Sequence, residues 1–114
     1  MTQHVQIKPA TAADHDQWLP LWQAYLTFYN TELPAEVSES TWQRFLDPAE
    51  PTQLAIAWQG DKAVGIVQFI YHRSNWSIGN SCYLQDLFVS PEIRGTGAGR
   101  LLIEHVYATA RDNH

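Results

Sequence analysis

The sequence predicts an α+β fold in which helices flank a mixed, mainly antiparallel sheet, in the element order β-α-α-β-β-β-α. Two observations favour this class. Apolar residues recur at helical spacing in the first half of the chain and near its end, and they alternate in the middle. Consecutive strands with short links form an antiparallel meander that helices then cover. The length of 114 residues predicts one domain, over 1–114.

The first half is predicted to be a short strand and two helices. Residues 4–8 alternate as a strand does, and Pro9 ends that strand. Thr11-Ala12-Ala13-Asp14 has the form of a capping box, which begins a helix over 13–29. The apolar residues of this helix follow at helical spacing, and they are Trp18, Trp22, Tyr25, Leu26 and Tyr29.

A second, shorter helix is expected after a connection over 30–37. Ser38 or Ser40 is predicted to cap its N-terminus. Its buried stripe is expected to consist of Trp42, Phe45 and Leu46. The run from Asp47 to Pro51 ends it, because proline lacks an N–H and restricts the residue before it.

The second half begins with strands and closes with a helix. Alternating or apolar runs predict strands over 54–58, 64–71 and 82–89. Gly60-Asp61 is the turn of the first hairpin, and the polar stretch 74–80 is the next turn region. Ser90-Pro91-Glu92 stops the last strand, and a helix is predicted over 101–110.

Composition excludes several classes of protein. The net charge of −5 argues against a nucleic-acid binder, because Lys and Arg dominate affinity for phosphate backbones. No signal peptide is evident, and no apolar run approaches the ~18 residues that span a membrane. The single cysteine, Cys82, forms no internal disulfide, so we expect a cytoplasmic protein. The five histidines lack metal-ligand spacing, so no metal site is expected.

The most informative segment lies between the last strand and the last helix, and it reads Arg94-Gly95-Thr96-Gly97-Ala98-Gly99-Arg100. The first N–H groups of a helix have no partner within the helix and sit at its partially positive end. Glycines let a phosphate approach this backbone closely. A P-loop would need Lys and Ser/Thr after the last glycine, and a dinucleotide loop would need a different glycine spacing.

The segment matches [QR]-x-x-G-x-[GA] at every position, and here the chain resembles the GCN5-related N-acetyltransferase (GNAT) superfamily. The preceding run from Leu84 to Gly97 is similar to that family's apolar-x-apolar-x-V-x-P-x-x-R-G-x-G pattern. The run from Ile7 to Asp14 resembles its first strand and helix start. The resemblance implies an acyl-CoA N-acyltransferase fold, acetyl-CoA as co-substrate without a metal, and acetyl transfer to a primary amine.

The resemblance also implies which residues hold acetyl-CoA. In that family, backbone amides of the loop bind the pyrophosphate. The corresponding residues here are Arg94, Gly95, Thr96, Gly97, Ala98, Gly99 and Arg100. The Arg100 side chain would either add a charge-assisted contact or be solvated. Main-chain groups of Leu87, Phe88 and Val89 would hold the pantetheine arm, and the N–H near Leu87 would stabilise the oxyanion.

The acceptor amine must lose a proton before it attacks, so a base or a water chain is required. Many members of the superfamily carry an acidic residue in the strand before the loop, and the resemblance therefore implies Asp86 as the base, directly or through water, or as a group that attracts a cationic acceptor. His72 and Tyr83 are lesser candidates. The alternative for Asp86 is a hydrogen-bonding role at the strand end. The acceptor is a small amine, a polyamine, an amino acid or a protein amine, and residues 25–33 are expected to border its site. Trp22, Tyr25 and Tyr29 are expected to be core residues.

Relatives in this superfamily continue beyond the last helix with a strand, a helix and a hairpin, which supply the general acid. The chain ends at His114, where that strand is expected, so we expect the fold to be incomplete at its C-terminus. The strand over 82–89 would then present an unpaired edge. We expect either a homodimer that covers this edge or a polypeptide truncated by cloning or proteolysis. The alternative function is a non-catalytic CoA-binding or dimerising remnant.

Overall fold

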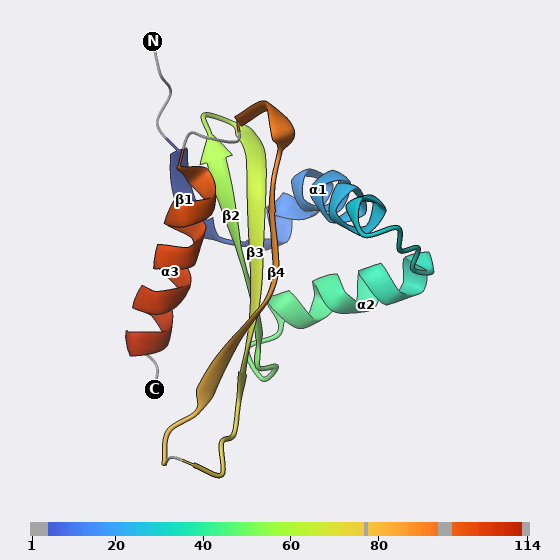
Figure 1. Ribbon diagram of the computed structural model, residues 1–114. Coiled ribbons are helices and arrows are strands. Elements are labelled where there is room, and N and C mark those ends of the chain that lie inside the picture. Colours follow the sequence, from blue (N-terminus) through green and yellow to red (C-terminus); the bar gives the residue numbers. More distant parts are fainter. Residues whose placement is uncertain (1–4, 77, 94–96, 113–114) are drawn as a thin grey trace.

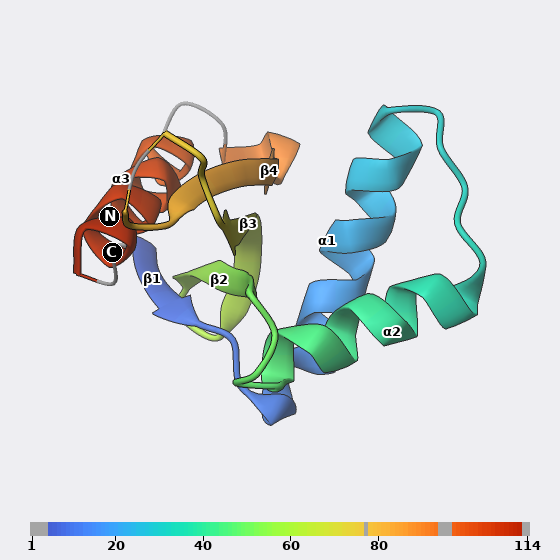
Figure 2. The same ribbon diagram turned by 90° about the horizontal axis from the view of Figure 1, so that it is seen from below.

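The computed structural model describes residues 5–76, 78–93 and 97–112, and it forms three layers (Figures 1 and 2). Helix α3 covers one face of an antiparallel sheet, and α1 and α2 cover the other. The four strands follow chain order across the sheet and are β1 (Val5–Pro9), β2 (Thr52–Gln59), β3 (Lys62–His72) and β4 (Ser81–Val89). The helices are α1 (His15–Phe28), α2 (Ala35–Leu46) and α3 (Ala98–Asp112), with short 3₁₀ turns η1 (Ala12–Asp14) and η2 (Pro91–Ile93).

The sheet is buried on both faces. On one face, tryptophans of α1 and α2 pack against Ile56, Ile66 and Phe88. On the other, Leu102 and Val106 of α3 pack against small and branched residues of the central strands. This double burial explains the nearly continuous apolar runs of β2 and β3. The α+β prediction and the three predicted central strands are confirmed.

Helix α2 corrects one boundary of the sequence prediction. It begins at Ala35, after Pro34, so the predicted N-caps Ser38 and Ser40 are wrong. Ser38 is buried within the helix, where its Oγ accepts a hydrogen bond of 2.9 Å from Trp22 Nε1. The serine hydroxyl therefore joins two helices rather than capping one of them.

Two further boundaries differ from expectation. β1 continues through Pro9, which pairs with Ala55, because an edge strand tolerates the missing N–H of proline. His4, the predicted first residue of that strand, lies outside the described residues. Helix α3 begins at Ala98, three residues before the predicted start at Leu101, so Ala98, Gly99 and Arg100 form its first turn.

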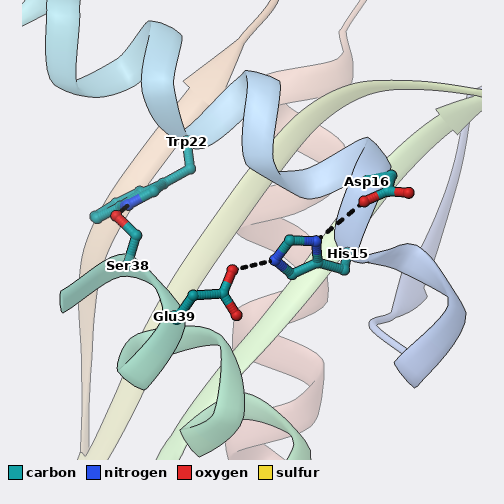
Figure 3. A network of polar contacts seen from close by, with 5 residues as sticks. All are labelled: His15, Asp16, Trp22, Ser38 and Glu39. Carbon is teal, nitrogen blue, oxygen red and sulfur yellow. Dashed lines mark hydrogen bonds and ion pairs between the residues drawn. The ribbon is translucent and has the colours of Figure 1, made fainter. Parts of the chain in front are cut away.

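His15, the first residue of α1, connects this helix to Glu39 of α2 on the same face of the sheet (Figure 3). Its Nε2 lies 2.6 Å from Glu39 Oε1 of α2, and its Nδ1 lies 3.1 Å from Asp16 Oδ1. The imidazole also packs edge-on against Trp42, at 5.2 Å between centroids. Hydrogen bonds to Asp16 and then Glu39 raise the pKa of His15 above its ordinary value.

This contact predicts a pH-dependent stability. Because the folded-state pKa of His15 is raised, its stabilising contribution is complete below about pH 6.5 and is lost as pH rises through the folded-state pKa. Glu39→Gln should therefore destabilise the fold more at pH 6 than at pH 8.5, by less than about 1 kcal/mol because the pair is solvent-exposed. Urea unfolding at both pH values measures this difference. Glu36→Gln on the same helix is the control, and equal effects of both variants at both pH values would contradict the prediction.

Candidate active site

Strand β4 carries an irregularity at the residues that the sequence singled out. Gln68 of β3 pairs with Asp86, whereas the next residue, Phe69, pairs with Leu84. Gln85 is therefore an additional residue, and β4 bulges at this point. A bulge leaves a residue unpaired and increases the local twist. The segment Asp86–Val89 thus follows directly after a break in the β3–β4 ladder.

Side chains alternate along the end of β4. Leu87 and Val89 pack with the α3 core, and Phe88 is buried in the core formed by α1 and α2. Asp86, two residues before Phe88, is on the same face as Phe88. Among the described strands β4 pairs with β3 alone, so its other edge lies at the margin of the sheet.

A cavity of about 490 Å³ opens on this face of the sheet, beside α2, the start of β2 and the interior of β3 and β4. Asp86 and Gln68 line it together with Arg44 and Glu50, which are its other charged residues. Its remaining lining residues are Trp22, Leu33, Thr41, Phe45, Pro51, Thr52, Ile70 and Gln85. Leu33 lies in the 25–33 segment that was expected to border the acceptor site.

The Asp86 carboxylate is held by a buried polar network. Trp18 Nε1 donates to Gln68 Oε1 at 2.9 Å, and Gln68 Nε2 donates to Asp86 Oδ2 at 2.8 Å. The Gln68 side chain is 2% exposed, so it has little contact with water. Both ends of its amide are satisfied, which fixes its orientation and directs its NH₂ at the carboxylate.

Tyr25 also contacts this carboxylate. Burial and then a hydrogen bond with Asp86 raise the pKa of the Tyr25 phenol well above its ordinary value. The phenol therefore stays neutral at physiological pH and remains a hydrogen-bond donor. Tyr25 packs with the core of α1 and α2, as predicted, and its hydroxyl also reaches Asp86. Tyr29 was predicted to be a core residue as well, but it is 60% exposed, so that prediction is wrong.

The glycine-rich segment is described from Gly97 onward, and Arg94, Gly95 and Thr96 lie outside the described residues. Gly97 has a φ of +90°, a conformation that side chains with a Cβ rarely adopt. The first helical bond runs from Leu101 N–H to Gly97 O at 3.0 Å. Within the described part of the chain, the N–H groups of Ala98, Gly99 and Arg100 donate no hydrogen bond.

The side chains of this first turn divide between core and solvent. Ala98 is buried, and a Cβ on Gly99 would lie 3.6 Å from Val89 Cγ2, so the turn packs on β4. The Arg100 side chain is 85% exposed, and its Nε donates to Glu104 Oε1 at 2.9 Å. Its contact with a phosphate stays a prediction.

Sequence reasoning missed two residues of the site. Gln68 is a polar residue in the middle of an apolar strand, and that was a usable signal for a buried polar contact. Arg44 had no comparable signal, because nothing in its helical sequence separates it from an ordinary surface arginine. Across 5–76, 78–93 and 97–112, no group of three or more His, Cys, Asp or Glu residues is arranged to hold a metal ion.

Comparison with known proteins identifies the class. Residues 16–114 match the Acetyltransferase (GNAT) family. The chain is 35% identical over 109 residues to a D-amino-acid N-acetyltransferase of Saccharomyces cerevisiae, covering 93% of this chain and 67% of that protein. It is 37% identical over 65 residues to the thialysine N-epsilon-acetyltransferase of Bos taurus, of which it spans 34%.

Solved structures agree on the fold. A probable acetyltransferase superposes with a TM-score of 0.83 at 25% identity, covering 96% of this chain and 73% of that one. An aminoglycoside acetyltransferase from an uncultured soil metagenomic sample superposes with a TM-score of 0.77 at 18% identity, covering 95% and 70%. The protein belongs to the acetyltransferase (GNAT) family. The family and the names of its relatives indicate an acetyl-CoA-dependent N-acetyltransferase.

Proposed function

We propose that this protein transfers the acetyl group of acetyl-CoA to a small primary amine that enters the cavity beside Asp86. The observation that carries the proposal is the position of the Asp86 carboxylate. It lines the cavity, immediately after the β4 bulge, and it is oriented by Gln68. Relatives that act on small amines support the class of acceptor.

Asp86 meets two chemical needs of this reaction. An ammonium ion cannot attack a thioester, because it has no lone pair. A carboxylate at the cavity wall attracts the ammonium and accepts its proton, directly or through water. The amine then attacks the thioester carbonyl, and the negative charge that develops on the carbonyl oxygen needs a donor. The Leu87 N–H on the neighbouring main chain is the proposed donor. When the tetrahedral intermediate collapses, the C–S bond breaks and CoA leaves as a thiolate, which takes up the second proton that the nitrogen releases.

The proposed acetyl-CoA site runs from the end of β4 to the start of α3. Main-chain groups of Leu87–Val89 would align the pantetheine arm, and amides of residues 94–100 would bind the pyrophosphate. The N–H groups of Ala98, Gly99 and Arg100 donate no hydrogen bond to a described residue, which fits an anion at a helix N-terminus. Acetyl-CoA supplies the activated acetyl group. The protein positions this group and supplies the hydrogen-bond donor for the oxyanion and the base.

Thermal shift with acetyl-CoA, followed by thiol release on a panel of amines, tests the proposed function. Stabilisation by acetyl-CoA and amine-dependent thiol release are expected. Stabilisation without thiol release would favour the alternative of a CoA-binding module without turnover. Absence of both would refute the proposal.

Gly97→Ala is expected to weaken acetyl-CoA binding at least 10-fold. No atom of the described residues lies within 4 Å of a Cβ at Gly97, but the φ of +90° is unfavourable for alanine, so the backbone of the proposed pyrophosphate site must change. Isothermal titration with acetyl-CoA measures the loss. Gly60→Ala is a matched control, because Gly60 also has a positive φ, of +62°, and open space, but lies in the β2–β3 turn. Equal acetyl-CoA affinities in the two variants would contradict this prediction.

The assembly and location of the protein also remain proposals. We propose a homodimer in which a second copy covers the margin of β4, because an exposed strand edge pairs readily with another chain. Sedimentation velocity at micromolar concentration would show a monomer if this is wrong. We also propose a cytoplasmic location, which fluorescence microscopy of the tagged protein would contradict by labelling another compartment. Among the described residues, no helix has the length and apolar character needed to cross a membrane.

A further inference from the structure

The cavity beside Asp86 carries opposite charges on different elements. Asp86 is on β4, and Arg44 is on α2. Arg44 is the only basic residue among the described residues that line the cavity. Within the described part of the chain its guanidinium has no ion pair, although Glu50 lines the same cavity. An unpaired guanidinium at a cavity wall is a ready partner for an anionic group of a ligand.

We propose that the acceptor is a free amino acid whose carboxylate binds Arg44 while its amine reaches Asp86. The inference rests on the proposed function, because it assigns the acceptor of that same site. A guanidinium binds a carboxylate through two parallel hydrogen bonds, which fix the orientation of the ligand as well as its affinity. The same ligand then presents its amine to the Asp86 carboxylate.

The charges of the cavity disfavour the other acceptor classes. Polyamines and aminoglycosides carry several ammonium groups and no anionic group that could pair with Arg44. The Arg44 side chain is exposed, and a simple monoamine would offer its guanidinium no anionic partner. Glu50 and Asp86 together outnumber Arg44, so a ligand that is only anionic would be repelled. A zwitterion satisfies both signs.

The apolar walls suggest which amino acids fit. Trp22, Phe45 and Ile70 line the cavity together with the charged residues, so an apolar side chain has a surface to cover. A volume of about 490 Å³ accommodates a free amino acid with an aromatic side chain. Phenylalanine is therefore a suitable probe, and phenylalaninamide is the same molecule without the carboxylate.

The test compares these two probes in thiol-release assays on the full chain. The wild type should show a kcat/KM at least 10-fold higher for phenylalanine, as the D or the L enantiomer, than for phenylalaninamide. Arg44→Gln should lower kcat/KM for phenylalanine by about 10- to 100-fold, mainly through KM, because a hydrogen bond to a charged group contributes about 1.5–3 kcal/mol. Activity on the amide should stay within about twofold. Arg44→Lys keeps the positive charge but lacks the planar guanidinium. Its kcat/KM for phenylalanine should lie between those of the wild type and Arg44→Gln.

Two controls separate recognition from a structural effect. Arg111→Gln replaces an exposed arginine of α3, outside the cavity, and should leave both probes unaffected. Calorimetric binding of phenylalanine and phenylalaninamide in the presence of CoA gives the same comparison without requiring turnover.

Each outcome of these measurements is decisive. A wild type that does not prefer phenylalanine, or an Arg44→Gln variant that loses both probes equally, would overturn the assignment of Arg44 while leaving the N-acetyltransferase proposal intact. Absence of thiol release from every amine, with no stabilisation by acetyl-CoA, would refute the proposed function instead. In that case calorimetry still decides whether Arg44 binds the carboxylate.

Discussion

Asp86→Asn is expected to lower kcat/KM for acetyl transfer by about 100-fold or more, with acetyl-CoA binding unchanged. General-base catalysis contributes about 10²- to 10⁴-fold, and asparagine has no basic oxygen. Its amide still offers an oxygen to Gln68 Nε2, which donates to Asp86 at 2.8 Å in the native protein. The variant therefore removes the base while keeping the volume and much of the network. Thiol-release kinetics give kcat/KM, and calorimetry gives the acetyl-CoA affinity.

The pH profile distinguishes a base from a residue that only positions the ligand. If Asp86 accepts the proton, the loss should be smallest at high pH, where more of the amine is already deprotonated. Asp61→Asn is the matched control, because Asp61 is an exposed carboxylate in the β2–β3 turn, whereas Asp86 pairs with Gln68 further along β3. A wild-type rate in Asp86→Asn would leave this residue with only its hydrogen-bonding role at the strand.

The parts of the fold that the sequence predicted well are those that repeating patterns specify. Strands β2, β3 and β4 were recognisable because apolar runs ended at a Gly-Asp turn, a polar loop and a Ser-Pro pair. The start of α2 was misplaced, because serine is a good cap in isolation. Here the hydroxyl of Ser38 is used by Trp22, a contact between helices that no local pattern contains.

In the candidate site, too, local sequence patterns indicated some residues, whereas contacts between distant elements could not be predicted. Asp86 was predicted as the base because the resemblance implies an acidic residue in the strand before the glycine-rich motif, and its catalytic role stays a prediction. Its partners were not predicted, because Gln68 and Tyr25 are distant in sequence and meet Asp86 only after β3 and α1 pack against β4. The cavity that contains Arg44 likewise exists only between packed elements. A local motif can indicate a candidate catalytic residue. The hydrogen-bond partners and the cavity around that residue depend on tertiary contacts.

Trp18→Ala is expected to destabilise the fold by about 3–5 kcal/mol, a large share of the 5–15 kcal/mol typical of a domain. Trp18 is 0% exposed and stacks on Trp22 at 5.9 Å between centroids. Its ring also contacts Trp42, at 5.2 Å, so α1, α2 and the sheet all lose packing when it is truncated. Urea unfolding measures the change. Trp76→Ala is the control, because Trp76 is 96% exposed and its loss should change stability by less than about 0.5 kcal/mol.

Trp18→Phe separates packing from the polar network. Phenylalanine keeps most of the buried surface but has no N–H, so Gln68 Oε1 loses the donor that lies 2.9 Å away. The stability loss should be about 1–3 kcal/mol, the usual penalty for an unsatisfied buried group. Since Gln68 orients Asp86, this variant should also reduce kcat while it remains folded. Normal kcat in a folded Trp18→Phe variant would show that Asp86 does not depend on the Trp18–Gln68 hydrogen bond for its position.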